Sequence, residues 1–223
     1  MKQPPRAIIF DLDGTLLDTI TDIANCANKV LSDWGLPTFP VTTYSALVGD
    51  GLTNLARKAL PEPHRDPSSI SAFVEDYRVL YSQRWNETSK PYPGILELLD
   101  ELAARSIPLA VFSNKRDDFT KVCVASFFPN IPFGEVRGER AGTPIKPDPT
   151  GALEIARALR VDPSQCLLVG DSEIDIATSL NAGMRNVGVL WGFRPQEVLE
   201  KAGAHTLISR PAELLSVMDQ HES

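Results

Sequence analysis

The chain has 223 residues, of which 43% are hydrophobic and 23% are charged, so it can bury a substantial core. Its net charge of −7 argues against a general binder of nucleic acid or of a membrane surface, because such proteins carry basic patches. The three cysteines lack a C-x-x-C spacing and no run of 18 apolar residues occurs, so neither a zinc site nor a membrane-spanning helix is indicated. We expect a globular, cytoplasmic protein with free thiols.

The first predicted element is a short buried strand at residues 7–10, with the sequence A-I-I-F. Four apolar residues without alternation, bounded by polar residues, favour a strand of a parallel sheet that is covered on both faces. Asp11 and Asp13 follow it directly in D-L-D-G-T. Because ligands of open α/β sheets bind at the carboxyl ends of the strands, this stretch predicts a site of chemistry.

Three helices are expected next, with no strand between them. Apolar residues recur at helical spacing from Ile20 to Leu31, from Leu52 to Ala59 and from Ile70 to Tyr81. Such a stretch interrupts the alternation of strands and helices, so residues 18–90 are predicted to form an inserted helical module.

Two short segments are predicted to link this module to the rest of the chain. Leu16–Thr19 leads into it, and the breaker-rich segment Lys90–Gly94, K-P-Y-P-G, leads back. Asp18 or Thr19 is available to cap the first helix. The predicted domains are therefore a core of residues 1–17 and 91–223 and a module of residues 18–90, and two linkers close in space would form a hinge.

Strands and helices alternate through the rest of the chain. Helices are expected near residues 95–102, 117–127, 152–159, 174–182 and 196–202 and at the carboxyl terminus, and strands near 108–113, 134–138, 166–170, 186–190 and 205–208. Regular alternation predicts parallel strands joined by right-handed crossovers. The expected fold class is α/β, a doubly wound parallel sheet with an inserted helical cap.

Three predicted strands end in polar residues that suit phosphate chemistry. They lead into Asp11, into Ser113-Asn114 and into Asp171, and Lys146 immediately precedes a helix begun by P-D-P. Taken singly, these residues have ordinary interpretations: a turn, a helix cap, a surface lysine, or an acidic residue at a helix start. In a parallel sheet all of these strand ends share one edge, so their coincidence favours a functional site.

The order D-L-D-G-T, S-N, K-P and G-D-S-E-I-D resembles the haloacid dehalogenase superfamily, over nearly the whole chain. Asp13, where the halide-removing members have another residue type, points to the phosphatase and phosphomutase branch. The longer runs V-F-S-N-K at residues 111–115 and W-G-F at residues 191–193 look most like those of phosphoglycolate phosphatases. The inserted module occupies the position of a C1 cap.

The resemblance implies roles for the aspartates. Asp11 is the expected nucleophile, which forms an aspartyl-phosphate, and Asp13 is the expected general acid and then base. Mg²⁺ is the expected cofactor, because hard oxygen ligands and a phosphate suit it and no soft ligand cluster is present. Its implied ligands are the Asp11 carboxylate, the Asp13 main-chain carbonyl and Asp171, while Asp175 orients the site from behind these ligands.

The remaining implied roles concern the substrate. Ser113, Lys146 and, as a further candidate, Asn114 are expected to hold phosphoryl oxygens, assisted by the backbone N–H groups after Asp11. In the cap, candidate substrate-binding residues surround a predicted helix start, where free N–H groups favour anions. They are Gly49, Gly51, Arg57 and Lys58, of which the two basic residues also suit a solvated surface.

The expected function is hydrolysis of a small anionic phosphomonoester, 2-phosphoglycolate above others, by a Mg²⁺-dependent enzyme. A sugar phosphomutase, a pyrophosphatase or a nucleotidase on the same core stays open, as does a catalytically idle protein that binds a phosphorylated ligand. No nucleic acid or membrane partner is expected, and the sequence leaves the oligomeric state open.

Overall fold

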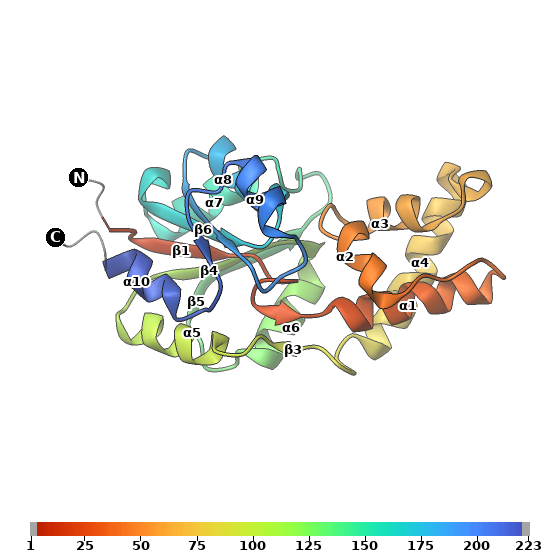
Figure 1. Cartoon of the computed structure of the whole chain (residues 1–223), viewed down its shortest axis with the longest axis horizontal. Helices are drawn as coiled ribbons and strands as arrows, with labels where there is room; N and C mark the ends of the chain where they lie inside the picture. Colours follow the sequence, from red (N-terminus) through yellow and green to blue (C-terminus); the bar gives the residue numbers. More distant parts are fainter. Residues whose placement is uncertain (1–3, 220–223) are drawn as a thin grey trace. The chain divides into compact units, whose positions relative to one another are not determined.

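The computed structural model describes residues 4–219 (Figure 1). The chain divides into two compact units, one made of the residues up to Leu17 and from Pro91 onward, the other of Asp18–Lys90. We call them the core and the cap. At the two crossings between them, β2 (Leu17–Asp18) pairs with β3 (Lys90–Pro91) in a two-stranded sheet.

The core contains a six-stranded sheet in which every pairing is parallel. The strand order is β5-β4-β1-β6-β7-β8. The bounds of these strands are β1 Ala7–Phe10, β4 Leu109–Arg116, β5 Phe133–Glu139, β6 Cys166–Gly170, β7 Arg185–Val189 and β8 Leu207–Ile208. The predicted doubly wound α/β fold is thereby confirmed.

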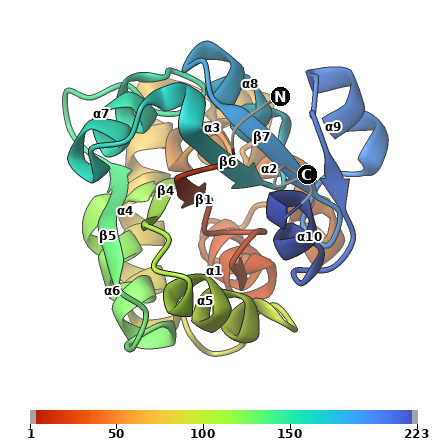
Figure 2. The same ribbon diagram turned by 90° about the vertical axis from the view of Figure 1, so that its left-hand side faces the viewer.

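Helices cover both faces of this sheet. In Figure 2, α7 and α8 lie on one face, and α5, α6 and α10 lie on the other. The helices of the core are α5 Ile95–Ala104, α6 Asp117–Phe127, α7 Thr150–Leu159, α8 Glu173–Asn181, α9 Gln196–Ala202 and α10 Glu213–Asp219. Burial on two sides explains why β1 is apolar at every position: all four of its residues are buried.

The strand order brings the carboxyl ends of β4, β1 and β6 side by side in the sheet. From β1 the chain runs outward through β4 and β5, and then returns to the other side of β1 with β6. Ile9 is paired with Ala110 of β4 and with Leu168 of β6. Because this reversal of direction leaves a crevice at the carboxyl ends of β4, β1 and β6, the segments after these three strands are the expected place for a ligand.

The cap is a small helical unit with its own core. Its α-helices are α1 Ile20–Asp33, α2 Tyr44–Leu47, α3 Leu52–Ala59 and α4 Pro67–Arg84. Tyr44 and Phe73 are fully buried, and Phe73 stacks on Tyr77 with ring centroids 6.5 Å apart. Helix α4 begins at a proline after Asp66, whose carboxylate accepts the N–H groups of Ser68 and Ser69, an arrangement typical of an N-cap.

Details of local structure differ from the sequence predictions. Thr19 precedes α1, but neither its side chain nor any other caps the helix, because the backbone of Thr19 is already helical. Helix α2 was not predicted, since four residues carry no visible period. Helix α7 begins at Thr150, later than the predicted P-D-P start. Within residues 4–219, no helix combines the length and apolar character that crossing a membrane requires.

Candidate active site

Asp11 is the first residue after β1, and its position follows from the burial of that strand. Its backbone N–H still donates to Val169 of β6, which extends the sheet pairing by one residue. The neighbouring N–H of Leu12 donates to Asp11 Oδ1 at 2.7 Å. Asp11 is therefore a buried carboxylate held at the central strand end, where the sequence predicts the nucleophile.

The turn after Asp11 is compact because several N–H groups converge on one carbonyl. Those of Thr15, Leu16 and Leu17 donate to the carbonyl oxygen of Leu12, and Gly14 N–H donates to Leu17. Asp13 lies in this turn with its side chain 19% exposed. The turn thus presents a second carboxylate two residues after the first.

Asp171 follows β6 and is enclosed by two glycines. A Cβ atom on Gly14, which has φ +89°, would lie 2.4 Å from Asp171 Oδ2, and one on Gly192 would lie 2.2 Å from Asp171 Cβ. The carboxylate accepts hydrogen bonds from Thr15 Oγ1 at 3.2 Å and from the N–H of Phe193 at 2.7 Å. The loop of residues 191–193 and the turn after β1 therefore fix the orientation of Asp171.

Lys146 joins two of the aspartates. Its side chain is 2% exposed, and its Nζ lies 2.8 Å from Asp11 Oδ1 and 2.6 Å from Asp175 Oδ1. Asp175 uses its other oxygen to accept from the N–H and hydroxyl of Ser172, which completes a capping box at the start of α8. Both oxygens of Asp175 are engaged, so its geometry suits a residue that orients Lys146.

Ser113 and Asn114 follow the buried part of β4. The Asn114 side chain donates to the carbonyl of Lys146 at 3.0 Å and accepts from the N–H of Lys146 at 2.8 Å. Ser113 is buried, and its hydroxyl oxygen accepts from the N–H of Lys115. These contacts give Asn114 a clear part in positioning the backbone of Lys146, and its binding of phosphate stays a prediction.

Burial and crowding dominate the electrostatics of this cluster. Burial and the charge of Asp175 raise the pKa of Asp11 well above its ordinary value, against the attraction of Lys146. The same two causes raise the pKa of Asp171 to about 7. Burial lowers the pKa of Lys146, but the charges of Asp11 and Asp175 outweigh it and raise that pKa, so the ammonium stays charged.

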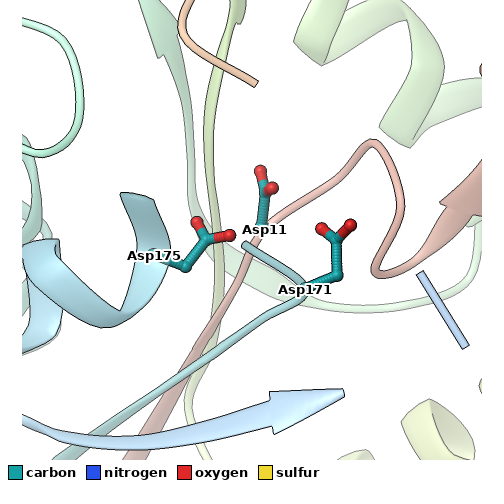
Figure 3. A group of neighbouring side chains, drawn as sticks. All are labelled: Asp11, Asp171 and Asp175. Atoms are coloured by element: carbon teal, nitrogen blue, oxygen red, sulfur yellow. The ribbon is translucent and has the colours of Figure 1, made fainter. Parts of the chain in front are cut away.

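The donor set fits a hard divalent cation. Asp11, Asp171 and Asp175 are buried, and each offers a carboxylate oxygen within 4.8 Å of the others. In Figure 3 the carboxyl group of Asp175 points toward Asp11, while those of Asp11 and Asp171 point side by side in one direction. Lys146 contacts two of these three carboxylates, those of Asp11 and Asp175, and added positive charge would relieve the mutual repulsion of all three. Oxygen-only ligands of this kind suit Mg²⁺.

The predicted substrate residues of the cap lie around the start of α3. Gly49 and Gly51 have φ values of +115° and +86°, and Gly51 is the N-cap. Arg57 donates to Asn54, and Lys58 Nζ lies 2.9 Å from Asp50 Oδ2. The two basic side chains thus have partners within the cap, and their role toward a substrate stays a prediction.

Sequence reasoning did not assign a role to several residues that shape this site. Lys115 contacts Asp13, while Thr15 and Phe193 bind Asp171. The runs V-F-S-N-K and W-G-F contain two of these residues, but a run of letters does not show which distant side chain each one meets.

Comparison with known proteins shows to which family the chain is related. Residues 8–189 match the family model of the haloacid dehalogenase-like hydrolases. A phosphoglycolate phosphatase of Aquifex aeolicus is 33% identical over 221 residues, which cover 97% of this chain and 98% of that protein. One of Psychrobacter arcticus is 30% identical over 194 residues, 84% of each chain.

A solved structure shows the same architecture. It is the structure of a protein from Lactobacillus delbrueckii subsp. bulgaricus that is described as an inferred phosphoglycolate phosphatase. It is 29% identical, with a TM-score of 0.91 over 97% of this chain and 99% of that one. The chain therefore belongs to the haloacid dehalogenase-like hydrolase family. Within that family it is an enzyme of the phosphatase branch.

Proposed function

We propose that the chain is a Mg²⁺-dependent phosphatase that hydrolyses 2-phosphoglycolate to glycolate and phosphate through an aspartyl-phosphate. The observation that carries this proposal is the ion pair between Lys146 and Asp11 at the end of the central strand. A carboxylate nucleophile needs an adjacent cation that also holds the incoming phosphoryl group, and this lysine is buried beside it. The substrate is supported by the two relatives named phosphoglycolate phosphatase.

The first half of the proposed reaction transfers the phosphoryl group to the enzyme. An Asp11 carboxylate oxygen attacks phosphorus, and the bond from phosphorus to the bridging oxygen breaks. Asp13 gives its proton to that oxygen, so glycolate leaves as a neutral alcohol at its hydroxyl end. Lys146 and Ser113 hold phosphoryl oxygens while the charge shifts between attacking and leaving atoms.

The second half releases phosphate. Asp13, now a carboxylate, takes a proton from water as the water oxygen bonds to phosphorus and the bond from Asp11 to phosphorus breaks. Both aspartates return to their starting protonation states. Mg²⁺ would be held by the carboxylates of Asp11 and Asp171 and the carbonyl of Asp13, where it supplies charge neutralisation to the phosphoryl oxygens.

The three cysteines of the chain are free and buried, which supports our proposal that the enzyme works in the reducing cytoplasm.

The test is release of inorganic phosphate from 2-phosphoglycolate by the purified protein. We expect turnover with Mg²⁺, none with excess EDTA, and a loss on the order of 10⁴-fold or more in Asp11→Asn, since the nucleophile is removed. Asp33→Asn, which alters an exposed aspartate paired with Lys29, is the matched control and should keep wild-type activity. Steady turnover by Asp11→Asn would refute the assigned nucleophile.

Product analysis by phosphorus NMR separates the remaining candidate functions. A phosphatase liberates phosphate, whereas a mutase conserves the ester in a new position. A broad panel of phosphomonoesters, pyrophosphate and nucleotides then ranks the substrates. Tight binding of Mg²⁺ and phosphoester without turnover of any of them would support an idle binding protein instead.

A further inference from the structure

Lys115 forms an ion pair with Asp13 that no part of the mechanism above uses. Its Nζ lies 2.8 Å from each of the two carboxylate oxygens of Asp13. The lysine side chain is 9% exposed and that of Asp13 is 19% exposed. A pair that is shielded from water to this degree is held in one geometry more firmly than an exposed pair.

The backbone of Lys115 is itself fixed. The register of β4 against β5 shifts between Phe112 and Arg116, so Lys115 lies in an irregular part of the strand. Its N–H donates to Ser113 Oγ at 3.2 Å, and its carbonyl accepts from Thr120 Oγ1 at 3.0 Å. The Lys115 side chain therefore extends from a backbone that is held by hydrogen bonds. This part of the strand also carries Ser113, which we expect to hold phosphate.

Asp13 is held by its backbone and by its side chain. The hydrogen bonds to the carbonyl of Leu12 hold the backbone of the turn, and Lys115 contacts both carboxylate oxygens of the side chain. Lys115 supplies the constraint from the adjacent strand, 102 residues away in sequence. Since catalytic proton transfer requires hydrogen-bond distance to the reacting oxygen, such a constraint bears directly on the rate.

We propose that Lys115 is a positioning residue for Asp13, which it orients toward the leaving oxygen of the substrate. This inference rests on the proposed phosphatase function. When Asp13 is protonated, the oxygen that carries the proton releases its contact with the Lys115 ammonium and the other oxygen keeps that contact. The O–H then gives its proton to the bridging oxygen as the ester bond breaks. Lys115 keeps all of its own protons, and no bond to it forms or breaks.

The chemistry of the leaving group separates this role from others. An alkoxide is a poor leaving group and needs the proton of Asp13, whereas p-nitrophenolate is a stable anion and leaves without it. A residue that acts through Asp13 therefore affects kcat/KM for alkyl phosphates and affects kcat/KM for p-nitrophenyl phosphate little, because kcat/KM reports the steps up to departure of the leaving group and not the later hydrolysis of the aspartyl-phosphate. A residue that binds the phosphoryl group matters equally for both.

The experiment compares kcat/KM of Lys115→Met and wild type on 2-phosphoglycolate, ethyl phosphate and p-nitrophenyl phosphate. We expect falls of about 10- to 100-fold on the two alkyl esters and less than about threefold on the aryl ester. Asp13→Asn should give the same pattern with a larger fall. Lys115→Arg, which keeps the charge, should recover much of the lost activity. Lys121→Met, which removes an exposed lysine paired with Asp117, is the control.

Two results would overturn the inference. Equal changes on all three substrates, including no change, would exclude a role through Asp13. A rise in KM confined to 2-phosphoglycolate would instead assign Lys115 to the substrate carboxylate. Failure of the wild-type enzyme to hydrolyse any of the three esters would refute the proposed function itself, so the two failures are distinguishable.

Discussion

The cap and the core each bury aspartate side chains, but they treat the negative charge in opposite ways. In the cap, Asp22 accepts hydrogen bonds from the N–H and hydroxyl groups of both Thr88 and Ser89, at 2.7–3.0 Å. Burial raises the pKa of Asp22, but these donors outweigh it and lower that pKa overall. In the core, crowding and burial raise the pKa of Asp171.

The difference separates a carboxylate that stabilises the fold from carboxylates that we propose take part in the reaction. Asp22 has its donors built in, so its charge needs nothing further. Asp11, Asp171 and Asp175 of the core lie together, and the buried Lys146 contacts only two of them among the described contacts, so this cluster would gain most from a bound cation. Carboxyl groups whose pKa values are raised by burial and by neighbouring carboxylates are typical of functional sites, which supports the proposed role of this cluster.

In this comparison of cap and core aspartates, the largest predicted effect is on activity and follows from changing Asp171. Asp171→Asn removes a proposed metal ligand, so we expect kcat/KM for 2-phosphoglycolate to fall at least about 100-fold. The asparagine oxygen can still accept from the N–H of Phe193, and its NH2 group can donate to the hydroxyl of Thr15, which can also accept. Because the substitution also removes a crowded charge, without metal it should raise the free energy of unfolding by about 1 kcal/mol. Urea unfolding in EDTA measures the second effect. A marked loss of stability would show that Asp171 is structural, like Asp22.

Asp22→Asn should lower stability and leave activity unchanged, which is the reverse of the result expected for Asp171→Asn. The NH2 group of the introduced asparagine would face the N–H groups of Thr88 and Ser89, which can only donate. We therefore expect the free energy of unfolding to fall by about 3 kcal/mol at pH 7. Activity per folded molecule should stay near that of wild type. Urea unfolding followed by circular dichroism and phosphate release on the same preparation give both numbers. Loss of activity without loss of stability would contradict the structural role.

The difference in the free energy of unfolding between wild type and Asp22→Asn should become smaller at acid pH. The folded pKa of Asp22 lies below the ordinary value of 3.8, so its contribution is present above pH 3.8 and is lost as the pH falls through the depressed folded value. The stability gap between wild type and Asp22→Asn should therefore shrink between pH 5 and pH 3, taken here as about one unit either side of the ordinary pKa. A gap that widens toward acid pH would be inconsistent with the hydrogen-bonded carboxylate.

Added Mg²⁺ should stabilise the core selectively. A ligand that binds only the folded state at about 100 times its dissociation constant adds about 2.7 kcal/mol. We expect the wild-type protein to gain roughly this amount in thermal or urea unfolding and Asp171→Asn to gain almost nothing. Asp22→Asn should gain as much as wild type. An equal gain in all three proteins would place the cation somewhere other than the aspartate cluster.

The sequence predicts the positions of Asp11, Ser113, Asn114 and Asp171 well, because each follows an apolar run whose burial is a local property. Parallel pairing then brings these strand ends to one edge without further information. The family resemblance adds chemical roles to these positions. For this reason the fold class follows from the sequence alone.

Long-range contacts between side chains do not follow from local sequence patterns. The pairing of Lys115 with Asp13 and of Phe193 with Asp171 depends on the register shift in β4 and on the path of the loop after β7. Neither feature has a local period. In the cap, α2 is too short to show a hydrophobic period. The cap helices also lack the strand ends that mark the site residues of the core, so the roles of Arg57 and Lys58 stay predictions.

The smallest predicted effect tests those two residues. If the start of α3 binds the carboxylate of 2-phosphoglycolate, Arg57→Ala and Lys58→Ala should each raise KM for this substrate about fivefold, the order of 1 kcal/mol that a partly exposed charge pair contributes. KM for ethyl phosphate, which lacks a carboxylate, should not change. Lys58 already pairs with Asp50, so Asp50→Asn removes a competing negative charge and should lower KM for 2-phosphoglycolate alone. Equal changes on both substrates would remove the cap from carboxylate recognition and leave selectivity to the core.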